Sequence, residues 1–405
     1  MTPQRTVIVG AGHGGTTAAV DLRARGYEGE VVLLSDEPVE PYERPPLSKG
    51  WLTADGAPEP LHGAAALAER GVTLRLGARA AALDLEKRAV RLEDGEALPY
   101  THAILATGSR ARRLPLPGID ADGVFSLRTA ADAEGLRGVL VPGARLVVVG
   151  AGYIGLEVAA SARARGADVS IVELADRPMA RTASAPISAF YQARHEAEGV
   201  RFVMPSGVAS VETDSGRATG VHLTDGTVLP ADAVLIAAGG VPDIALAEGA
   251  GLTTGGGVLT DEAGRTSDAS VFAIGDAARR PTPWADAPIR LESVHSALEM
   301  ARLAAAAITN TKPPALVAPW FWSDQYDLKL QIAGLVGAIP AELIVREGTN
   351  TLSVFSVAGD RLLAVEAVND PRAYMTGRMA LTRGQRVDPS VLADPARDVK
   401  DALLR

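Results

Sequence analysis

The chain has 405 residues, a formal net charge of −9, a hydrophobic fraction of 47% and no cysteine. This length is too great for one ordinary hydrophobic core and predicts a globular protein of two or three domains. The net charge argues against general binding to nucleic acids or anionic membranes. The lack of cysteine excludes disulfides, redox-active thiols and cysteine-ligated iron–sulfur clusters.

The sequence contains no recognisable targeting or metal-binding pattern. The six histidines show no H-x-x-x-H or similar ligand spacing, so we expect no metal site. No apolar run reaches the length of a membrane-spanning helix without interruption. The chain enters a predicted strand almost at its first residue, which leaves no room for a signal peptide, and we therefore expect a cytoplasmic protein.

The first predicted strand, residues 6–9, runs directly into a glycine-rich turn. The turn reads Gly10-Ala11-Gly12-His13-Gly14-Gly15 and precedes a predicted helix over residues 16–25. A second apolar strand covers residues 30–34, and Asp36 stands just past its end. In this arrangement backbone N–H groups approach a pyrophosphate at the helix N-terminus, and the acid accepts hydrogen bonds from ribose hydroxyls.

The same plan is repeated in the middle of the chain. A strand over residues 145–149 leads into Gly150-Ala151-Gly152-Tyr153-Ile154-Gly155, and a helix is predicted over residues 156–165. The strand at residues 168–172 then ends at Glu173. Two complete fingerprints predict two bound dinucleotides, and two nucleotide-free α/β repeats are the alternative.

Each repeat also contains a predicted hairpin and a late strand. The hairpins cover residues 89–98 and 218–229, with Asp94-Gly95 and Asp225-Gly226 at their turns. A further strand at residues 271–274 ends in Gly275-Asp276 after the second repeat is complete. The simplest interpretation is that the first domain resumes there, which makes the second repeat an insertion.

The last part of the chain has a different pattern. Residues 328–332, 342–345, 351–357 and 361–368 alternate like an antiparallel meander. The predicted fold class is α/β, with two Rossmann-like dinucleotide-binding domains, one inserted in the other, and a C-terminal α+β domain. The predicted boundaries are 1–113 with 241–316 for the first domain, 114–240 for the inserted domain and 317–405 for the C-terminal domain.

Three further strings point to a known family. They are Arg44-Pro45-Pro46-Leu47-Ser48-Lys49, the segment from Gly152 to Glu157, and Pro319-Trp320-Phe321-Trp322-Ser323-Asp324-Gln325-Tyr326. Together with the two fingerprints they resemble the glutathione-reductase-type flavoproteins, and within them the ferredoxin reductases of bacterial oxygenase systems. The resemblance implies FAD in the first domain, NADH in the inserted domain, and electron transfer to a small [2Fe-2S] ferredoxin that supplies a cytochrome P450 or a ring-hydroxylating oxygenase.

The resemblance and the fingerprints together predict the site residues. The residues expected to contact FAD are Gly10, Gly12, Gly14, Gly15, Asp36, Lys49, Ala82, Arg128, Asp276 and Val294. Those expected to contact NADH are Gly150, Gly152, Tyr153, Ile154, Gly155 and Glu173. Val294 begins a predicted helix whose N-terminal N–H groups would face the flavin. Arg128 has the alternative role of an interdomain salt bridge.

Lys49, Glu157 and Trp322 are the predicted catalytic residues. Lys49 and Glu157 lie in different predicted domains, but in relatives their motifs both face the flavin, so the two side chains are expected to meet as a buried ion pair near its reactive edge; a purely structural bridge is the alternative. Trp322 is expected near the flavin and the docking face, whereas Trp320 and Phe321 are expected in the core. Glu173 favours NADH, although Arg177 and Arg181 leave NADPH as an alternative.

An acidic ferredoxin would need a local basic patch on this acidic chain. The candidate arginines, for which ordinary solvated side chains are the alternative, are Arg290, Arg302, Arg372, Arg378, Arg383 and Arg386. We expect no nucleic-acid or membrane partner, and a monomer or weak dimer. The alternative functions are an NADH dehydrogenase that reduces quinone or rubredoxin, and a flavoprotein of the apoptosis-inducing-factor type.

Overall fold

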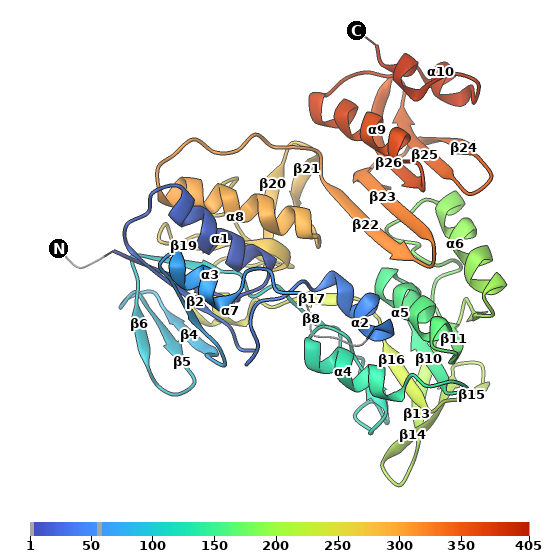
Figure 1. Cartoon of the computed structure of the whole chain (residues 1–405), viewed down its shortest axis with the longest axis horizontal. Helices are drawn as coiled ribbons and strands as arrows, with labels where there is room; N and C mark the ends of the chain where they lie inside the picture. Colours follow the sequence, from blue (N-terminus) through green and yellow to red (C-terminus); the bar gives the residue numbers. More distant parts are fainter. Residues whose placement is uncertain (1–3, 55–58, 405) are drawn as a thin grey trace. The chain divides into compact units, whose positions relative to one another are not determined.

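The computed structural model describes residues 4–54 and 59–404, and the chain divides into two compact units (Figure 1). The first unit comprises Met1–Glu43, Glu59–Arg110 and Val241–Val317, and the second comprises Arg44–Pro58, Ala111–Gly240 and Ala318–Arg405. The chain changes unit after residues 43, 58, 110, 240 and 317, and the third and fourth of these crossings lie within β8 (Ser109–Ala111) and β17 (Gly240–Pro242). The predicted boundaries of the three domains stay a prediction, and residues 1–3, 55–58 and 405 of those ranges lie outside the described residues.

A five-stranded parallel sheet forms the core of the first unit. Its strands lie in the order β19-β7-β1-β2-β3, and they are β1 (Arg5–Val9), β2 (Glu30–Leu34), β3 (Val72–Arg75), β7 (His102–Leu105) and β19 (Val271–Ala273). Four residues of β1 are buried in sequence, as in parallel sheets that are covered on both faces. Because β19 pairs with β7, the prediction that the first domain resumes near residue 271 is confirmed.

The helix after the first glycine turn begins earlier than predicted. α1 (His13–Ala24) starts three residues before Thr16, so Gly14 and Gly15 lie in its first turn. The low helix propensity of glycine favoured a later start, but packing of α1 against α8 (Val294–Ile308) overrides it. The other elements of the unit are α3 (Ala64–Glu69), β4 (Ala80–Asp84), β5 (Ala89–Leu92), β6 (Ala97–Pro99), α7 (Ala245–Gly249), β18 (Val258–Leu259), η2 (Gly275–Ala277), β20 (Ala278–Thr282) and β21 (Ala285–Ile289).

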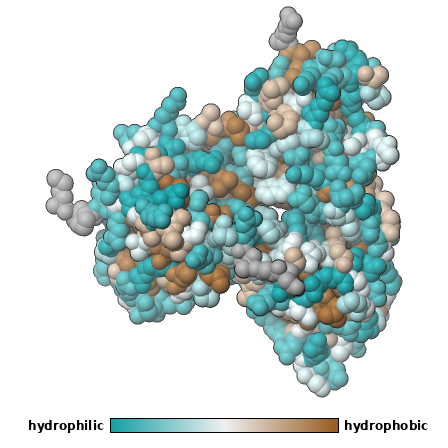
Figure 2. All heavy atoms as spheres, viewed as in Figure 1, coloured by the Kyte–Doolittle hydropathy of each residue, from teal (hydrophilic) through white to brown (hydrophobic). Residues whose placement is uncertain are grey.

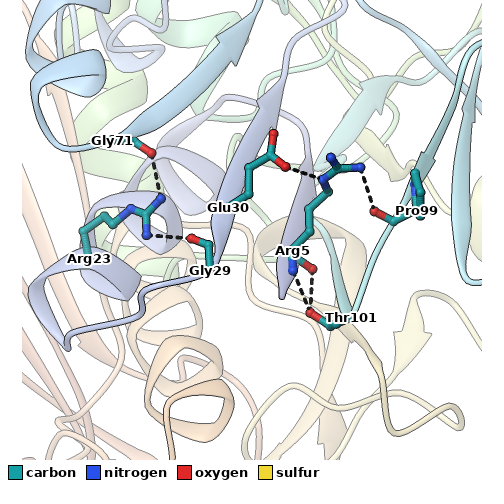
Figure 3. Close-up of polar contacts among 7 residues, drawn as sticks. All are labelled: Arg5, Arg23, Gly29, Glu30, Gly71, Pro99 and Thr101. Atoms are coloured by element: carbon teal, nitrogen blue, oxygen red, sulfur yellow. Dashed lines mark hydrogen bonds and ion pairs between the residues drawn. The ribbon is translucent and has the colours of Figure 1, made fainter. Parts of the chain in front are cut away.

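Two arginines form hydrogen bonds near the N-terminal ends of the strands of this sheet (Figure 3). The Arg5 guanidinium donates to Glu30 at 2.6 Å, directly across from it on β2. The Arg5 N–H donates to the Thr101 hydroxyl, which itself donates to the Arg5 carbonyl. The Arg23 guanidinium donates to the carbonyls of Gly29 and Gly71, both at 2.7 Å. The two Arg23 bonds satisfy the carbonyls of Gly29 and Gly71, which lie in loops just before β2 and β3.

The second unit repeats the parallel sheet, in the order β12-β11-β10-β16-β9. Its elements up to residue 236 are η1 (Pro45–Ser48), α2 (Gly50–Thr53), β9 (Val124–Phe125), α4 (Ala130–Val139), β10 (Arg145–Val149), α5 (Tyr153–Ala164), β11 (Asp168–Val172), α6 (Ala185–Ala197), β12 (Arg201–Val203), β13 (Val208–Asp214), β14 (Arg217–Leu223), β15 (Val228–Pro230) and β16 (Ala233–Ile236). The predicted hairpin at residues 218–229 is confirmed as β14 paired with β15.

The C-terminal part of the second unit is an antiparallel sheet in the order β22-β23-β26-β25-β24. Its elements are β22 (Trp320–Gln325), β23 (Leu328–Gly334), β24 (Glu342–Glu347), β25 (Leu352–Ala358), β26 (Arg361–Val368), α9 (Pro371–Arg383), α10 (Pro389–Ala393) and η3 (Val399–Ala402). All four predicted strands of the meander are present, and α9 packs on β26 and β23. The predicted fold class is therefore confirmed.

The surface shown in Figure 2 is mostly hydrophilic, with hydrophobic residues scattered over it. Among the residues that the structure describes, no helix is long and apolar enough to cross a membrane.

Candidate functional site

The first glycine turn is built for close approach of the backbone. Gly10 has a φ of +106°, and a Cβ at Gly15 would lie 1.8 Å from the Gly10 carbonyl oxygen, so neither position accepts a side chain. Gly12 caps α1, and no side chain of the described residues bonds to the free N–H groups of that cap. The helix N-terminus therefore has donors and a positive dipole end available for a phosphate.

Gly14 lies on the packed side of α1 rather than in this open turn. A Cβ there would meet the Ile274 side chain at 3.4 Å and the Ala297 carbonyl oxygen at 3.6 Å. Its absence lets α1 approach α8 closely. The prediction that Gly14 contacts the cofactor stays a prediction, but its immediate neighbours are protein atoms.

The remaining residues predicted for FAD in the first unit are placed as follows. Asp36 is exposed beyond β2, and Ala82 is exposed on β4. Asp276 follows β19 within η2, and its carboxylate accepts from the Ser109 hydroxyl at 3.0 Å. Val294 is the first residue of α8, which Ser293 caps. Ser109, the first residue of β8, was not among the predicted site residues.

Arg128 lies in the second unit, just before α4. Its N–H donates to the carboxylate of Asp132 at 2.9 Å, and its carbonyl accepts from the Arg44 guanidinium at 2.8 Å. Arg44 begins the string that ends at Lys49, so this contact joins that string to Arg128.

The second glycine turn has the same backbone restriction as the first. A Cβ at Gly155 would lie 2.1 Å from the Gly150 carbonyl oxygen, so Gly155 is required for packing. A Cβ at Gly152 would meet no described atom within 4 Å, and Gly152 caps α5 without a side-chain bond. The space beside Gly152 is therefore open, as an approaching pyrophosphate requires. Ile154 borders the turn and is 44% exposed.

Glu173 is fixed beside this turn. One carboxylate oxygen accepts from the Ala151 N–H at 2.7 Å, and the other accepts from the Ala175 N–H at 2.8 Å. The carboxylate thus lies next to the glycine turn, where an acid binds ribose hydroxyls. The Arg177 guanidinium donates to the carbonyls of Ala180 and Ala183 and to Ser188, so its donors serve the local fold.

The predicted meeting of Lys49 and Glu157 is confirmed, at 2.9 Å between Nζ and Oε2. Glu157 is 5% exposed and Lys49 is 19% exposed. Both residues belong to the second unit, although the predicted boundaries place them in different domains. Two hydroxyls complete the cluster: Ser48 donates to Oε2 at 2.5 Å, and Ser323 donates to Oε1 at 2.6 Å.

This cluster satisfies a buried charge with one cation and two short donors. Such charge-assisted bonds hold a carboxylate in one orientation. The ion pair was predicted from the sequence, whereas the roles of Ser48 and Ser323 were not. Both serines lie within the strings that carry the family resemblance, so the sequence did contain a pattern that could have identified them.

The aromatic strand β22 presents two different faces. Trp320 and Trp322 lie on one face, with ring centroids 5.6 Å apart, and the Arg378 guanidinium lies over the Trp320 ring at 5.1 Å. Phe321 and Ser323 lie on the other face, where Phe321 contacts the ring of Tyr153 at 4.6 Å. Trp320, Phe321 and Trp322 are all partly exposed. The roles predicted for Trp322 and Tyr153 stay predictions.

The six arginines predicted for docking differ in their contacts. Three pair with acids: Arg290 with Glu292, Arg372 with Asp398, and Arg386 with Asp360. Arg378 lies over Trp320, whereas Arg302 and Arg383 are exposed.

Comparison with known proteins gives two family matches that together cover nearly the whole chain. The model of the family described as pyridine nucleotide-disulphide oxidoreductase matches residues 4–301, and the model described as reductase C-terminal matches residues 320–403.

Individual relatives are similar over the same extent. Rhodocoxin reductase of Rhodococcus erythropolis is 43% identical over 403 residues, which cover 98% of this chain and 94% of the relative. A probable ferredoxin reductase of Castellaniella defragrans is 41% identical over 402 residues, which cover 98% of each. A chain in the crystal structure of the covalent putidaredoxin reductase–putidaredoxin complex has a TM-score of 0.95 and 38% identity, with 98% of both chains covered.

Proposed function

Because the chain belongs to the pyridine nucleotide-disulphide oxidoreductase family, we propose that it is an FAD-dependent reductase that passes electrons from NADH to a [2Fe-2S] ferredoxin. That ferredoxin would supply a cytochrome P450 or a ring-hydroxylating oxygenase. The observation that carries this proposal is the similarity, over 98% of both chains, to the reductase in the complex with putidaredoxin.

FAD, when bound, accepts two electrons as a hydride and releases them singly, which a chain without cysteine cannot do with its own side chains. The two glycine turns fit this cofactor pair. Gly12 and Gly152 leave helix N-termini without side-chain caps, and the space beside Gly152 is open among the described atoms. In this proposal the first turn holds the FAD pyrophosphate and the second holds that of NADH.

Glu173 supports NADH as the physiological donor. Its carboxylate accepts from ribose hydroxyls and repels a 2′-phosphate. Arg177 uses its guanidinium for local carbonyls, which leaves Arg181 as the exposed arginine of this loop. Lys49 would orient the reacting rings, and Glu157 would hold the Lys49 ammonium in place.

The predicted arginines, which lie in both units, would aid docking of an acidic partner. Arg302 and Arg383 are the exposed arginines of the predicted set that have no acidic partner among the described residues. Arg290, Arg372, Arg378 and Arg386 would contribute from positions that already contact protein groups. The protein would act in the cytoplasm, where NADH is supplied, as a monomer or weak dimer.

Stopped-flow kinetics would test the proposal. The holoenzyme is mixed with NADH or NADPH, and the reduced enzyme is then mixed with candidate [2Fe-2S] ferredoxins, a rubredoxin and a quinone. We expect faster flavin reduction by NADH than by NADPH, followed by transfer to a ferredoxin. Fast flavin reduction with transfer only to quinone or rubredoxin would reject the ferredoxin assignment.

A further inference from the structure

A line of buried polar side chains leads away from Glu157 through the second unit. The Ser323 hydroxyl contacts Glu157 Oε1 at 2.6 Å, and the Gln325 amide nitrogen contacts the Ser323 hydroxyl at 3.1 Å. The Gln325 amide oxygen then lies 2.8 Å from His195 Nε2, and His195 Nδ1 lies 3.0 Å from the Tyr326 hydroxyl. The line therefore runs continuously from the Lys49–Glu157 pair to the turn between β22 and β23.

These groups are thoroughly buried. Ser323 and His195 are 0% exposed, and Gln325 is 1% exposed. A buried polar group without a partner costs free energy, whereas every side chain along this line has one on each side. Apolar residues would fill the same space without needing hydrogen-bond partners. The polar side chains here therefore indicate a role beyond packing.

The donors of the line all point the same way. His195 is neutral because burial lowers its pKa to about 4, so it carries a single ring N–H at neutral pH. The Gln325 amide oxygen can only accept, so the ring proton lies on Nε2 and is donated to that oxygen. Nδ1 then accepts from the Tyr326 hydroxyl, which stays protonated because burial raises its pKa. The Gln325 N–H donates to Ser323, whose O–H is left for Glu157.

The outer end of the line lies on a constrained turn. Tyr326 has a φ of +55°, a conformation that a bulky residue rarely adopts. Such strain persists only where the surroundings hold the residue in place, and it occurs preferentially at functional sites. The Arg194 guanidinium lies 5.1 Å from the Tyr326 ring centroid and pairs with Asp327 at 2.9 Å, which holds the turn.

We propose that Ser323, Gln325 and His195 are positioning residues for the Lys49–Glu157 pair, and that their aligned donors hold the Glu157 carboxylate in the orientation in which it binds Lys49. The role at the flavin rests on the proposed function. The alignment itself does not, because it concerns only the side chains of the second unit. Hydrogen bonds aligned in one direction polarise one another, so a change at His195 is transmitted to Glu157.

The alignment is tested by nitrogen NMR of the holoenzyme labelled with ¹⁵N-histidine. The His195→Gln variant identifies the His195 signals, because only that residue is lost. We expect a neutral ring at pH 7 with its proton on Nε2 and slow exchange of that proton with solvent. A proton on Nδ1 would turn the Gln325 amide around, direct the Ser323 hydroxyl away from Glu157, and overturn the proposal.

The functional consequence is tested with two matched serine variants. Ser323 and Ser353 are both buried in the C-terminal sheet, and each hydroxyl donates to a carboxylate: Ser323 to Glu157 at 2.6 Å and Ser353 to Asp370 at 2.8 Å. We expect Ser323→Ala to lower the rate constant for flavin reduction at saturating NADH about tenfold, because a charged hydrogen bond is lost. Ser353→Ala should leave that rate constant unchanged.

A double-mutant cycle separates positioning from general destabilisation. In the Lys49→Met background, Ser323→Ala should change the rate by less than about twofold, because the pair it supports is already gone. His195→Gln retains an amide N–H in place of Nε2–H and should keep more of the rate than His195→Leu. An equal loss from Ser323→Ala with and without Lys49 would overturn the proposal. Failure of the wild-type enzyme to reduce ferredoxin would reject the proposed function alone.

Discussion

At the scale of single residues, the Lys49–Glu157 pair gives the clearest prediction. Lys49→Met removes the cation from a carboxylate that is 5% exposed. Truncating one partner of a buried pair costs about 3–5 kcal/mol, and we expect the low end here because Ser48 and Ser323 still donate to Glu157. Flavin reduction by NADH should slow markedly.

Urea unfolding and stopped-flow reduction measure the two effects of Lys49→Met. Lys329→Met, at an exposed lysine of β23, is the matched control and should change neither. A wild-type reduction rate in Lys49→Met would show that the bridge is only structural.

Glu173 gives a second prediction at this scale. Glu173→Ala removes the carboxylate that lies beside the glycine turn. Losing a charged hydrogen bond of about 1.5–3 kcal/mol should weaken NADH binding by about tenfold to a hundredfold. The dissociation constant follows from the NADH dependence of flavin reduction. Asp176→Ala, at an exposed acid three residues away, should bind NADH normally, and unaltered affinity in Glu173→Ala would contradict the assignment.

Sequence patterns identified these residues only where a motif carried them. Lys49, Glu157 and Glu173 stand at fixed places in strings or at strand ends. His195 belongs to no motif, yet it is completely buried and bonded to Gln325, which is 130 positions away. That contact joins a side chain of α6 to one of β22, which no spacing within the sequence reveals.

At the scale of elements, two variants of the second glycine turn distinguish an effect on NADH binding from an effect on folding stability. Gly152 has a φ of −76°, which alanine adopts without strain, and an added Cβ meets no described atom within 4 Å. Gly152→Ala should therefore keep the thermal stability of the NADH-free enzyme but weaken NADH binding at least about tenfold, because the methyl group occupies the space beside the pyrophosphate.

Gly155→Ala is the contrasting variant for this turn. Its Cβ would lie 2.1 Å from the Gly150 carbonyl oxygen, so the turn must move and the melting temperature should fall. Calorimetry and NADH titration of both variants distinguish the two effects. Normal NADH binding by Gly152→Ala would place the pyrophosphate elsewhere.

The buried position of His195 on α6 predicts a pH dependence of stability. Burial lowers the pKa of His195 from 6.5 to about 4. Between these values the unfolded chain binds a proton that the folded chain does not, so stability falls as the pH falls. This residue should account for a loss of about 3 kcal/mol between pH 6.5 and pH 4.

Urea unfolding at several pH values tests this loss. His195→Gln cannot titrate, so its stability should depend less steeply on pH over the same interval. The same slope in both proteins would assign the acid sensitivity to other groups.

At the scale of the whole molecule, charge governs the encounter with the partner. The chain carries a net charge of −9, so an acidic ferredoxin needs a local basic surface. Raising the ionic strength should slow electron transfer to the ferredoxin and leave reduction by NADH nearly unchanged, because salt screens exposed charges. Stopped-flow measurement of both half-reactions checks this, with the Arg302→Ala/Arg383→Ala variant expected to show a weaker salt dependence. Transfer that is independent of salt would exclude the basic patch.

The sequence by itself determined the two dinucleotide-binding repeats, the resumption of the first domain near residue 271 and the C-terminal meander. These features depend on local rules: alternation along a strand, glycine at turns and an acid at a strand end. Only the tertiary structure decided that Ser48, Ser323, Gln325 and His195 join the Lys49–Glu157 pair. Side chains from η1, α5, α6 and β22 meet there because burial requires each polar group to find a partner, whatever its distance along the chain.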